Sequence, residues 1–376
     1  MNNFEHIRPY HDTEVNTILK ELRDHPMIKA LLHFAFPEKS EAQIHEILDN
    51  CHSIRDFQTQ VIYYAVTNVL DRSCEGFSTS GFDKLDANTP YLFISNHRDI
   101  ILDTSLLNVA LFENNLLMTA SAIGDNLVQK PFLLALSKLN RSFLILREQS
   151  LRKMLESSKT VSNYIKQLLL HGHRSVWIAQ REGRTKDGND LTQQGVLKML
   201  ALASDEKDLM TYFRKLKIVP VSMSYEYDPT DVLKMPELMA KHYDQEYIKT
   251  SNEDFNSILK GALGKKKRIH IAAGEVFDKN LDIIAESGES ANGQLQLLAD
   301  EIDKQIHCNY KLWPPNYIAY DLLNESNRFK NEYTEKELRQ FERRLERRVD
   351  KDHKAAMNNF LAMYANPVNN YLKHNE

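Results

Sequence analysis

The stretch that decides the fold is YLFISNHRDIILD, residues 91–103. Its first five residues, 91–95, form a short and mostly apolar run of the length of a buried strand. A polar cluster follows at once at 96–99, and residues 100–112 are again largely apolar and favour a helix. A short apolar strand that ends in polar residues and passes into a helix is typical of an α/β core.

The same alternation repeats along the chain after this stretch. Further strands are predicted at 142–146, 175–179, 217–223 and 269–273, and helices at 128–139, 151–171 and 195–203. Gly172 marks the end of the longest helix, because glycine is favoured just past a helix C-terminus. The pattern predicts an α/β fold, with a mixed, largely buried β-sheet flanked by helices.

The ends of the chain differ from this core. Residues 12–78 show helical spacing of apolar side chains, and the chain beyond about 332 is charged and helix-prone. We therefore expect a helical N-terminal region at 1–85, an α/β core at 86–325 and a charged helical C-terminal extension at 326–376. The charged extension is expected to be a solvated helix face, with binding to anionic lipid as the alternative.

Composition limits the classes of function. The 376 residues are 42% hydrophobic and 27% charged, with a net charge of −4, so bulk basicity gives no argument for nucleic acid as a partner. Three widely spaced cysteines, Cys51, Cys74 and Cys308, argue against a disulfide framework or a zinc site and suit a reducing compartment. No apolar stretch reaches 18 residues and no signal peptide is evident, so we expect a cytoplasmic protein, with membrane-surface contact left open.

A histidine at a strand end is the first candidate for catalysis. His97 is followed by Asp99 and Asp103, within about two helical turns. A carboxylate that accepts a hydrogen bond from one ring nitrogen fixes the tautomer and favours the imidazolium that forms when the other nitrogen takes a proton. From spacing alone, the alternative is a buried histidine with a purely structural role.

Two arginines at other strand ends are candidates for binding an anion. Arg147 and Arg184 can each offer two parallel hydrogen bonds to a phosphate or carboxylate. Gly183 and Gly188 flank Arg184 and would let backbone approach an anion closely. A polar loop with surface ion pairs is the alternative.

Taken in order, these clusters resemble the glycerol-3-phosphate and lysophosphatidate acyltransferase superfamily, which has four sequence blocks beginning with a His-x4-Asp motif. The first block resembles SNHRDIILD at 95–103, and the second resembles Gly124-x-Asn126-Leu127 followed by SFLILR at 142–147. The third resembles REGRTKDG at 181–188, and the fourth IVPV at 218–221, with RIHIAAGE at 268–275 beyond it.

Two departures from the family pattern affect the site. Asp103 stands six residues after His97 and not five. Asp103 is the preferred partner of the histidine, because its place is closest to that of the motif's aspartate, and Asp99 either caps the helix or replaces Asp103 as the partner. Glu182 and Arg184 are separated by one residue and not two, which matches either a shortened Glu-Gly-Thr-Arg loop or the Gly-Arg-Ser-Arg version of the loop. Both departures indicate a divergent branch.

The resemblance implies an enzyme in which His97, oriented by Asp103 or Asp99, deprotonates an acceptor hydroxyl. That hydroxyl attacks an acyl thioester, either acyl-CoA or acyl-acyl-carrier-protein, while Arg147, Glu182, Gly183 and Arg184 bind the substrate. The acceptor implied is glycerol-3-phosphate or lysophosphatidate in phospholipid biosynthesis; a lyso-amino-acid lipid such as an ornithine or glycine lipid is the alternative. No metal or redox cofactor is expected. A non-catalytic lipid- or carrier-binding protein is the rival class.

Three further segments have less specific signals. The apolar run 131–136 suits core packing, an acyl tunnel or docking on a bilayer, and KKKR at 265–268 suits a solvated loop or an acidic partner. His171 and His173 have no evident carboxylate or third ligand nearby, so a polar turn is favoured over a metal site there.

Overall fold

The computed structural model describes residues 4–147, 150–250 and 252–375 of the chain. Its centre is a seven-stranded sheet in the order β1-β7-β6-β2-β5-β3-β4. The strands are β1 (Cys74–Ser80), β2 (Leu92–Ser95), β3 (Thr119–Gly124), β4 (Ser142–Ile145), β5 (Ser175–Ala179), β6 (Ile218–Tyr225) and β7 (Lys267–Ala273). The sheet is mixed, because β6 and β7 are antiparallel while the other pairs are parallel. The predicted fold class is confirmed.

Helices cover both faces of the sheet, and the alternation of side chains along each strand supplies both cores. On β2, Leu92 and Ile94 face one core and Phe93 faces the other. The first core contains helices α8 (Leu151–Leu170), α9 (Gln194–Ala201), α10 (Leu209–Leu216), α13 (Lys279–Ala285) and α14 (Ala291–Asn309). The second contains α5 (Tyr63–Ser73) and α6 (Leu102–Glu113).

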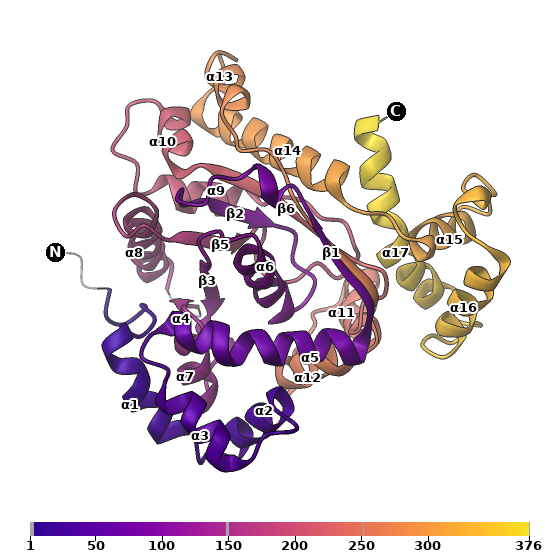
Figure 1. The fold of residues 1–376 in the computed structure, drawn as a ribbon. Coiled ribbons are helices and arrows are strands. Elements are labelled where there is room, and N and C mark those ends of the chain that lie inside the picture. Colours follow the sequence, from indigo (N-terminus) through magenta and orange to yellow (C-terminus); the bar gives the residue numbers. More distant parts are fainter. Residues whose placement is uncertain (1–3, 148–149, 251, 376) are drawn as a thin grey trace.

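Two smaller helical clusters flank this sandwich and lie at separate ends of the molecule (Figure 1). The N-terminal cluster comprises α1 (Asp12–Leu22), α2 (Pro26–Ala35), α3 (Glu41–Asp49), α4 (Ile54–Phe57) and the π-helical turn η1 (Gln58–Ile62). The C-terminal cluster comprises α11 (Asp231–His242), α15 (Pro314–Leu323), α16 (Glu335–Glu346) and α17 (Lys354–Asn375). Helices α7 (Pro131–Leu139) and α12 (Glu253–Leu263) and the short turns η2 (Phe82–Lys84), η3 (Asp125–Leu127) and η4 (Lys330–Glu332) complete the chain.

Two strands were missed by the sequence analysis. Strand β1 was assigned to the helical region, because it follows α5 without a loop and its seven residues are largely polar at the sheet edge. Strand β3 has the sequence TASAIG, whose alanines, serine and glycine have weak strand propensity. The helix predicted at 128–139 begins only at Pro131, the position that proline favours at a helix start.

The expectation of a solvated C-terminal helix face is wrong for one side of α16. Arg344 of α16 and Arg348, which follows the end of the helix, both bind the buried Asp231 of α11, and Phe341 and Leu345 are buried. These two arginine side chains therefore connect the C-terminal extension to α11, because they form ion pairs with a buried carboxylate.

The basic segment 265–268 is not a solvated loop. Lys266 is fully buried and donates to Ser73 Oγ and to two backbone carbonyls, while Lys267 and Arg268 pair with the buried Glu226. In the apolar run 131–136, Ala135 is buried. Leu133 and Leu134 pack against the first core of the sheet, and Leu136 packs against the N-terminal cluster. Across the described residues, no helix has the length and apolar character needed to span a membrane.

Candidate active site

The predicted clusters meet at one edge of the sheet. Strands β2, β3, β4, β5 and β6 are mutually parallel, so their carboxyl ends share that edge. His97 follows β2, Arg147 follows β4, the loop 180–193 follows β5, and Tyr225 ends β6. Ligand sites in α/β folds lie outside the carboxyl ends of such strands.

His97 contacts Asp103, which lies in the first turn of α6. His97 Nδ1 is 2.8 Å from Asp103 Oδ2, and the Asp103 side chain is fully buried while that of His97 is 13% exposed. The contact with a carboxylate makes Nδ1 the donor and leaves a lone pair on Nε2. Nε2 makes no hydrogen bond to any residue within the described ranges. An imidazole held in this way can accept a proton at Nε2.

Three further donors fix the Asp103 carboxylate. The backbone N–H groups of Arg98 and Asp99 donate to Oδ2 at 2.6 and 3.0 Å, and the Tyr225 hydroxyl donates to Oδ1 at 2.8 Å. Burial, and then the nearby Asp103, raise the pKa of Tyr225 well above its ordinary value, so the hydroxyl keeps its proton. With both oxygens occupied, the carboxylate has one orientation toward the imidazole.

Asp99, the alternative partner of the histidine, caps α6 instead. Its Oδ1 accepts from the backbone N–H groups of Ile101 and Leu102 at 3.0 and 2.9 Å. Its Oδ2 is buried without a hydrogen-bond partner, and a side chain at Gly261 of α12 would place its Cβ 1.9 Å from that oxygen. Burial, and then Asp103, raise the pKa of Asp99. Of the two carboxylates, Asp103 is the one in contact with the histidine.

Asp190 joins the turn after β2 to the loop after β5. Its Oδ1 accepts from Thr185 Oγ1 at 2.7 Å, and its Oδ2 accepts from Asn96 Nδ2 at 3.1 Å and pairs with Arg98. In addition, the Thr185 N–H donates to the carbonyl of His97 at 2.9 Å. Asp190 was not predicted as a site residue, because nothing in the sequence around it distinguishes it from other loop aspartates.

The two candidate arginines differ in their surroundings. Arg184 is buried, its Nη1 lacks a hydrogen-bond partner, and it makes no ion pair with any described residue. Arg147 is partly exposed and pairs with the exposed Glu182, which connects the second and third clusters. An unpaired buried guanidinium at the edge of a site suits an incoming anion.

The loop after β5 owes its shape to its glycines. Gly183 and Gly188 have φ values of +70° and +74°, which L side chains rarely adopt. Gly183 is open to solvent, with nothing within 4 Å of a would-be Cβ. At Gly188 a Cβ would lie 2.2 Å from the carbonyl oxygen of Met363, so this glycine admits the backbone of α17 and not a ligand.

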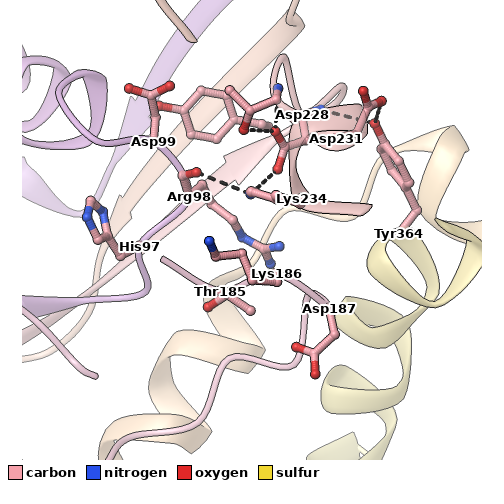
Figure 2. A network of polar contacts seen from close by, with 12 residues as sticks. His97, Arg98, Asp99, Thr185, Lys186, Asp187, Asp228, Asp231, Lys234 and Tyr364 are labelled. Atoms are coloured by element: carbon pink, nitrogen blue, oxygen red, sulfur yellow. Dashed lines mark hydrogen bonds and ion pairs between the residues drawn. The ribbon is translucent and has the colours of Figure 1, made fainter. Parts of the chain in front are cut away.

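Lys186 is a further cation of this loop that was not singled out from the sequence. It pairs with Glu237 of α11 at 2.6 Å, and burial lowers its pKa. Figure 2 shows Lys186 extending from the loop toward His97. The rings of Trp177 and His97 make a T-shaped contact, with centroids 5.4 Å apart, and Trp177 Nε1 donates to Ser95 Oγ. This apolar contact covers one side of the imidazole.

Comparison with known proteins gives a match over the region that holds this site. Residues 77–224 match the family model described as Acyltransferase. No curated protein matches the chain in sequence. Among solved structures, the chain is similar to PlsC, the 1-acyl-sn-glycerophosphate acyltransferase of Thermotoga maritima. That match has a TM-score of 0.38 and 11% identity, and covers 77% of this chain and 91% of that one. The resemblance in sequence to the acyltransferase family is therefore confined to residues 77–224, the segment that carries His97, Asp103, Arg147 and Arg184.

Proposed function

We propose that the protein moves a fatty acyl group from a thioester to the hydroxyl of a lipid precursor, with His97 as the general base and Asp103 as its partner. The observation that carries the proposal is the 2.8 Å contact between His97 Nδ1 and the buried, fully hydrogen-bonded Asp103. This contact leaves Nε2 as the basic nitrogen at the carboxyl edge of the sheet.

The reaction follows from this arrangement. Nε2 of His97 takes the proton of the acceptor hydroxyl while that oxygen attacks the thioester carbonyl carbon. The tetrahedral intermediate then collapses, the C–S bond breaks, and the imidazolium returns the proton to the leaving thiolate. Asp103 stabilises the imidazolium throughout, and backbone N–H groups of the loop after β5 are candidates to stabilise the oxyanion. No covalent enzyme intermediate, metal or redox cofactor is needed.

Cations around the site support an acceptor with an anionic group. Arg184 is buried and unpaired among the described residues, and Arg147 can exchange the exposed Glu182 for a substrate anion. Holding that anion would orient the hydroxyl toward His97. Glycerol-3-phosphate or lysophosphatidate supplies a phosphate, whereas a lyso-ornithine or lyso-glycine lipid supplies a carboxylate. We propose the phosphorylated acceptor, with the amino-acid lipid as the second candidate.

For the donor we propose acyl-CoA or acyl-acyl-carrier-protein, both of which present the same thioester. A protein that joins such a donor to a lipid acceptor would work in the cytoplasm, at the inner face of the cytoplasmic membrane.

The test is release of free thiol from each donor across phosphorylated and carboxylated acceptors. Wild type is compared with His97→Ala and with His171→Ala, a control in an exposed turn. Loss of a general base typically lowers the rate about 10²- to 10⁴-fold. We expect acceptor-dependent release that falls by that amount in His97→Ala and is unchanged in His171→Ala.

The other outcomes separate the parts of the proposal. Acceptor-dependent release that survives in His97→Ala would exclude His97 as the base. Arg184→Gln identifies the anion: it should raise KM for the true acceptor and leave KM for the donor unchanged. Absence of release with every donor and acceptor would contradict acyl transfer to this class of lipid precursor.

A further inference from the structure

Lys234 lies on α11, beyond the segment that matches the acyltransferase family. Its side chain is 1% exposed. The ammonium donates to the backbone carbonyl of Arg98 at 3.2 Å and pairs with Asp228 (Figure 2). A buried lysine is costly unless its charge is compensated. This one directs its hydrogen bond at the turn between His97 and Asp103.

The carbonyl that Lys234 contacts belongs to a peptide group of the active site. The N–H of the same peptide, that of Asp99, donates to Asp103 Oδ2 at 3.0 Å. His97 Nδ1 contacts that same oxygen. The peptide is therefore held from both sides, by Lys234 at its carbonyl and by Asp103 at its N–H. Without Lys234 the peptide can rotate, and Asp103 would lose one of its donors.

The position of Lys234 depends in turn on the C-terminal helices. Asp228 accepts from the N–H and hydroxyl of Thr230, both at 2.8 Å. The hydroxyl of Tyr364 of α17 accepts from the Asp228 N–H at 3.2 Å and donates to Asp231 Oδ2 at 2.9 Å. Figure 2 shows these residues forming one connected network from the turn after β2 to α17. The network gives Lys234 little freedom to move.

A structural role alone does not account for this arrangement. Buried ion pairs are often replaceable by apolar side chains at no cost in stability, so burial by itself gives no reason for a charge here. A cation fixed beside the histidine turn has a chemical consequence, because it holds the carbonyl of the peptide whose N–H donates to Asp103.

We propose that Lys234 is a positioning residue of the acyltransferase site, which holds the Arg98–Asp99 peptide so that the His97–Asp103 pair keeps its geometry and its basicity. The proposal rests on the proposed role of His97 as general base. It assigns a role in catalysis to α11, outside the acyltransferase segment 77–224.

Several charged or titratable groups around His97 bear on the test, and they come from every element packed on its turn. They are Arg98, Asp99 and Asp103 of the turn and α6, Arg184, Lys186 and Asp190 of the loop after β5, Tyr225 of β6, Asp228, Lys234 of α11, and Tyr310, whose ring lies against Arg98. Only Lys234 is changed in the test, so a shift in the titration of His97 reports on that one charge and on the peptide it holds.

The test compares Lys234→Met with Lys166→Met. Lys166 also donates to a backbone carbonyl, that of Ala203, and pairs with a carboxylate, that of Asp205, but it lies on α8. We expect Lys234→Met to lower kcat by about 10- to 100-fold, the equivalent of one hydrogen bond from a charged donor. The acid limb of the pH–rate profile should move to higher pH, while KM for the acyl donor is unchanged. Lys234→Arg should return the acid limb of the pH–rate profile to its wild-type position.

A second readout does not depend on turnover. In protein labelled with ¹⁵N-histidine, the His97 resonances are identified by their loss in His97→Gln and titrated directly. Lys234→Met should raise the pKa of His97, because a positive charge is removed and Asp103 loses a donor. Lys166→Met should leave it unchanged.

The outcomes are distinguishable. An unchanged His97 titration and pH–rate limb in folded Lys234→Met would overturn the role of Lys234 and leave the proposed function standing. If Lys234→Met does not fold, the double variant Lys234→Met/Asp228→Asn is compared with Asp228→Asn alone, so that Lys234 is again the only difference between the two proteins, and an unchanged His97 titration between them would overturn the proposal. If wild type transfers no acyl group, the proposed function fails, and the His97 titration alone decides whether Lys234 sets the basicity of the pair.

Discussion

Replacing Asp103 by asparagine isolates the charge of the histidine's partner from its geometry. Three donors point at Oδ2, namely His97 Nδ1 and the N–H groups of Arg98 and Asp99. Among the described residues, Oδ1 accepts only from the Tyr225 hydroxyl. A hydroxyl can accept as well as donate. The asparagine should therefore place its oxygen at the Oδ2 position and its amide toward Tyr225, and the tautomer of His97 is retained.

The loss expected is then that of the carboxylate charge. Unit charges about 4 Å apart interact by about 4 kcal/mol at the effective dielectric constant of about 20 that describes protein sites. The imidazolium forms only as the proton is transferred, so this energy is lost from the transition state. Since about 1.4 kcal/mol is a factor of ten in rate, kcat/KM should fall about 10³-fold.

Thiol release by Asp103→Asn measures this loss, and Asp99→Asn is the matched control. Asparagine caps a helix about as well as aspartate, so Asp99→Asn should stay within about threefold of wild type. The opposite order, with Asp103→Asn near wild type and Asp99→Asn reduced 100-fold or more, would refute the assignment of Asp103 as the partner of His97.

Three further predictions concern Tyr225, Gly261 and Asp303. Tyr225→Phe removes the 2.8 Å hydrogen bond to Asp103, so kcat/KM should fall about tenfold and the acid limb of the pH–rate profile should move up. Gly261→Ala places a Cβ 1.9 Å from the carboxylate that caps α6 and should lower Tm and activity, whereas Gly195→Ala meets nothing within 4 Å and should not. Burial raises the pKa of Asp303, in α14, to about 7 from 3.8. The folded state therefore loses stability as pH rises from about 4 to 7. Asp303→Asn should stabilise the protein more at pH 8 than at pH 5.

Each of these has a result that would contradict it. If the acid limb of the pH–rate profile of Tyr225→Phe matches that of wild type, the Tyr225 hydroxyl does not affect the titration of the His97–Asp103 pair. Equal Tm values for the two alanine variants would mean that α12 adjusts freely around the new Cβ. For Asp303, chemical denaturation at the two pH values is the measurement, and equal gains would show that the carboxyl is not protonated in the fold.

The parts of the fold that the sequence predicted are those with a strong local pattern. The apolar strands at 92–95, 142–145 and 175–179 lie within one residue of their predicted bounds. Their polar ends meet at one edge because parallel strands align their carboxyl ends, which is why clusters far apart in sequence could be expected to converge. The position of the motif's aspartate favoured Asp103 over Asp99 as the partner of His97, and in the structure Asp103 is the one in contact with the histidine.

What could not be predicted depends on contacts between distant segments. In the sequence Asp190 is an ordinary loop residue, and only the fold places Asn96, Arg98 and Thr185 in contact with it. Lys234 sits in a helix whose sequence shows no sign of the turn that it contacts, 136 residues earlier. Such residues leave no local pattern, because a buried polar group is marked only by the partners that the fold supplies.

The departure in spacing between histidine and aspartate has a structural explanation. The turn after β2 holds one more residue than the family motif, yet His97 and Asp103 are in contact. Asp99 accounts for this, because its side chain caps the backbone N–H groups of Ile101 and Leu102 and so begins α6 with Asp103 in its first turn. The longer turn carries two more backbone groups that need partners, and Lys234 and Asp103 satisfy the two ends of one peptide within it. The buried lysine of α11 therefore supports the turn that carries the additional residue.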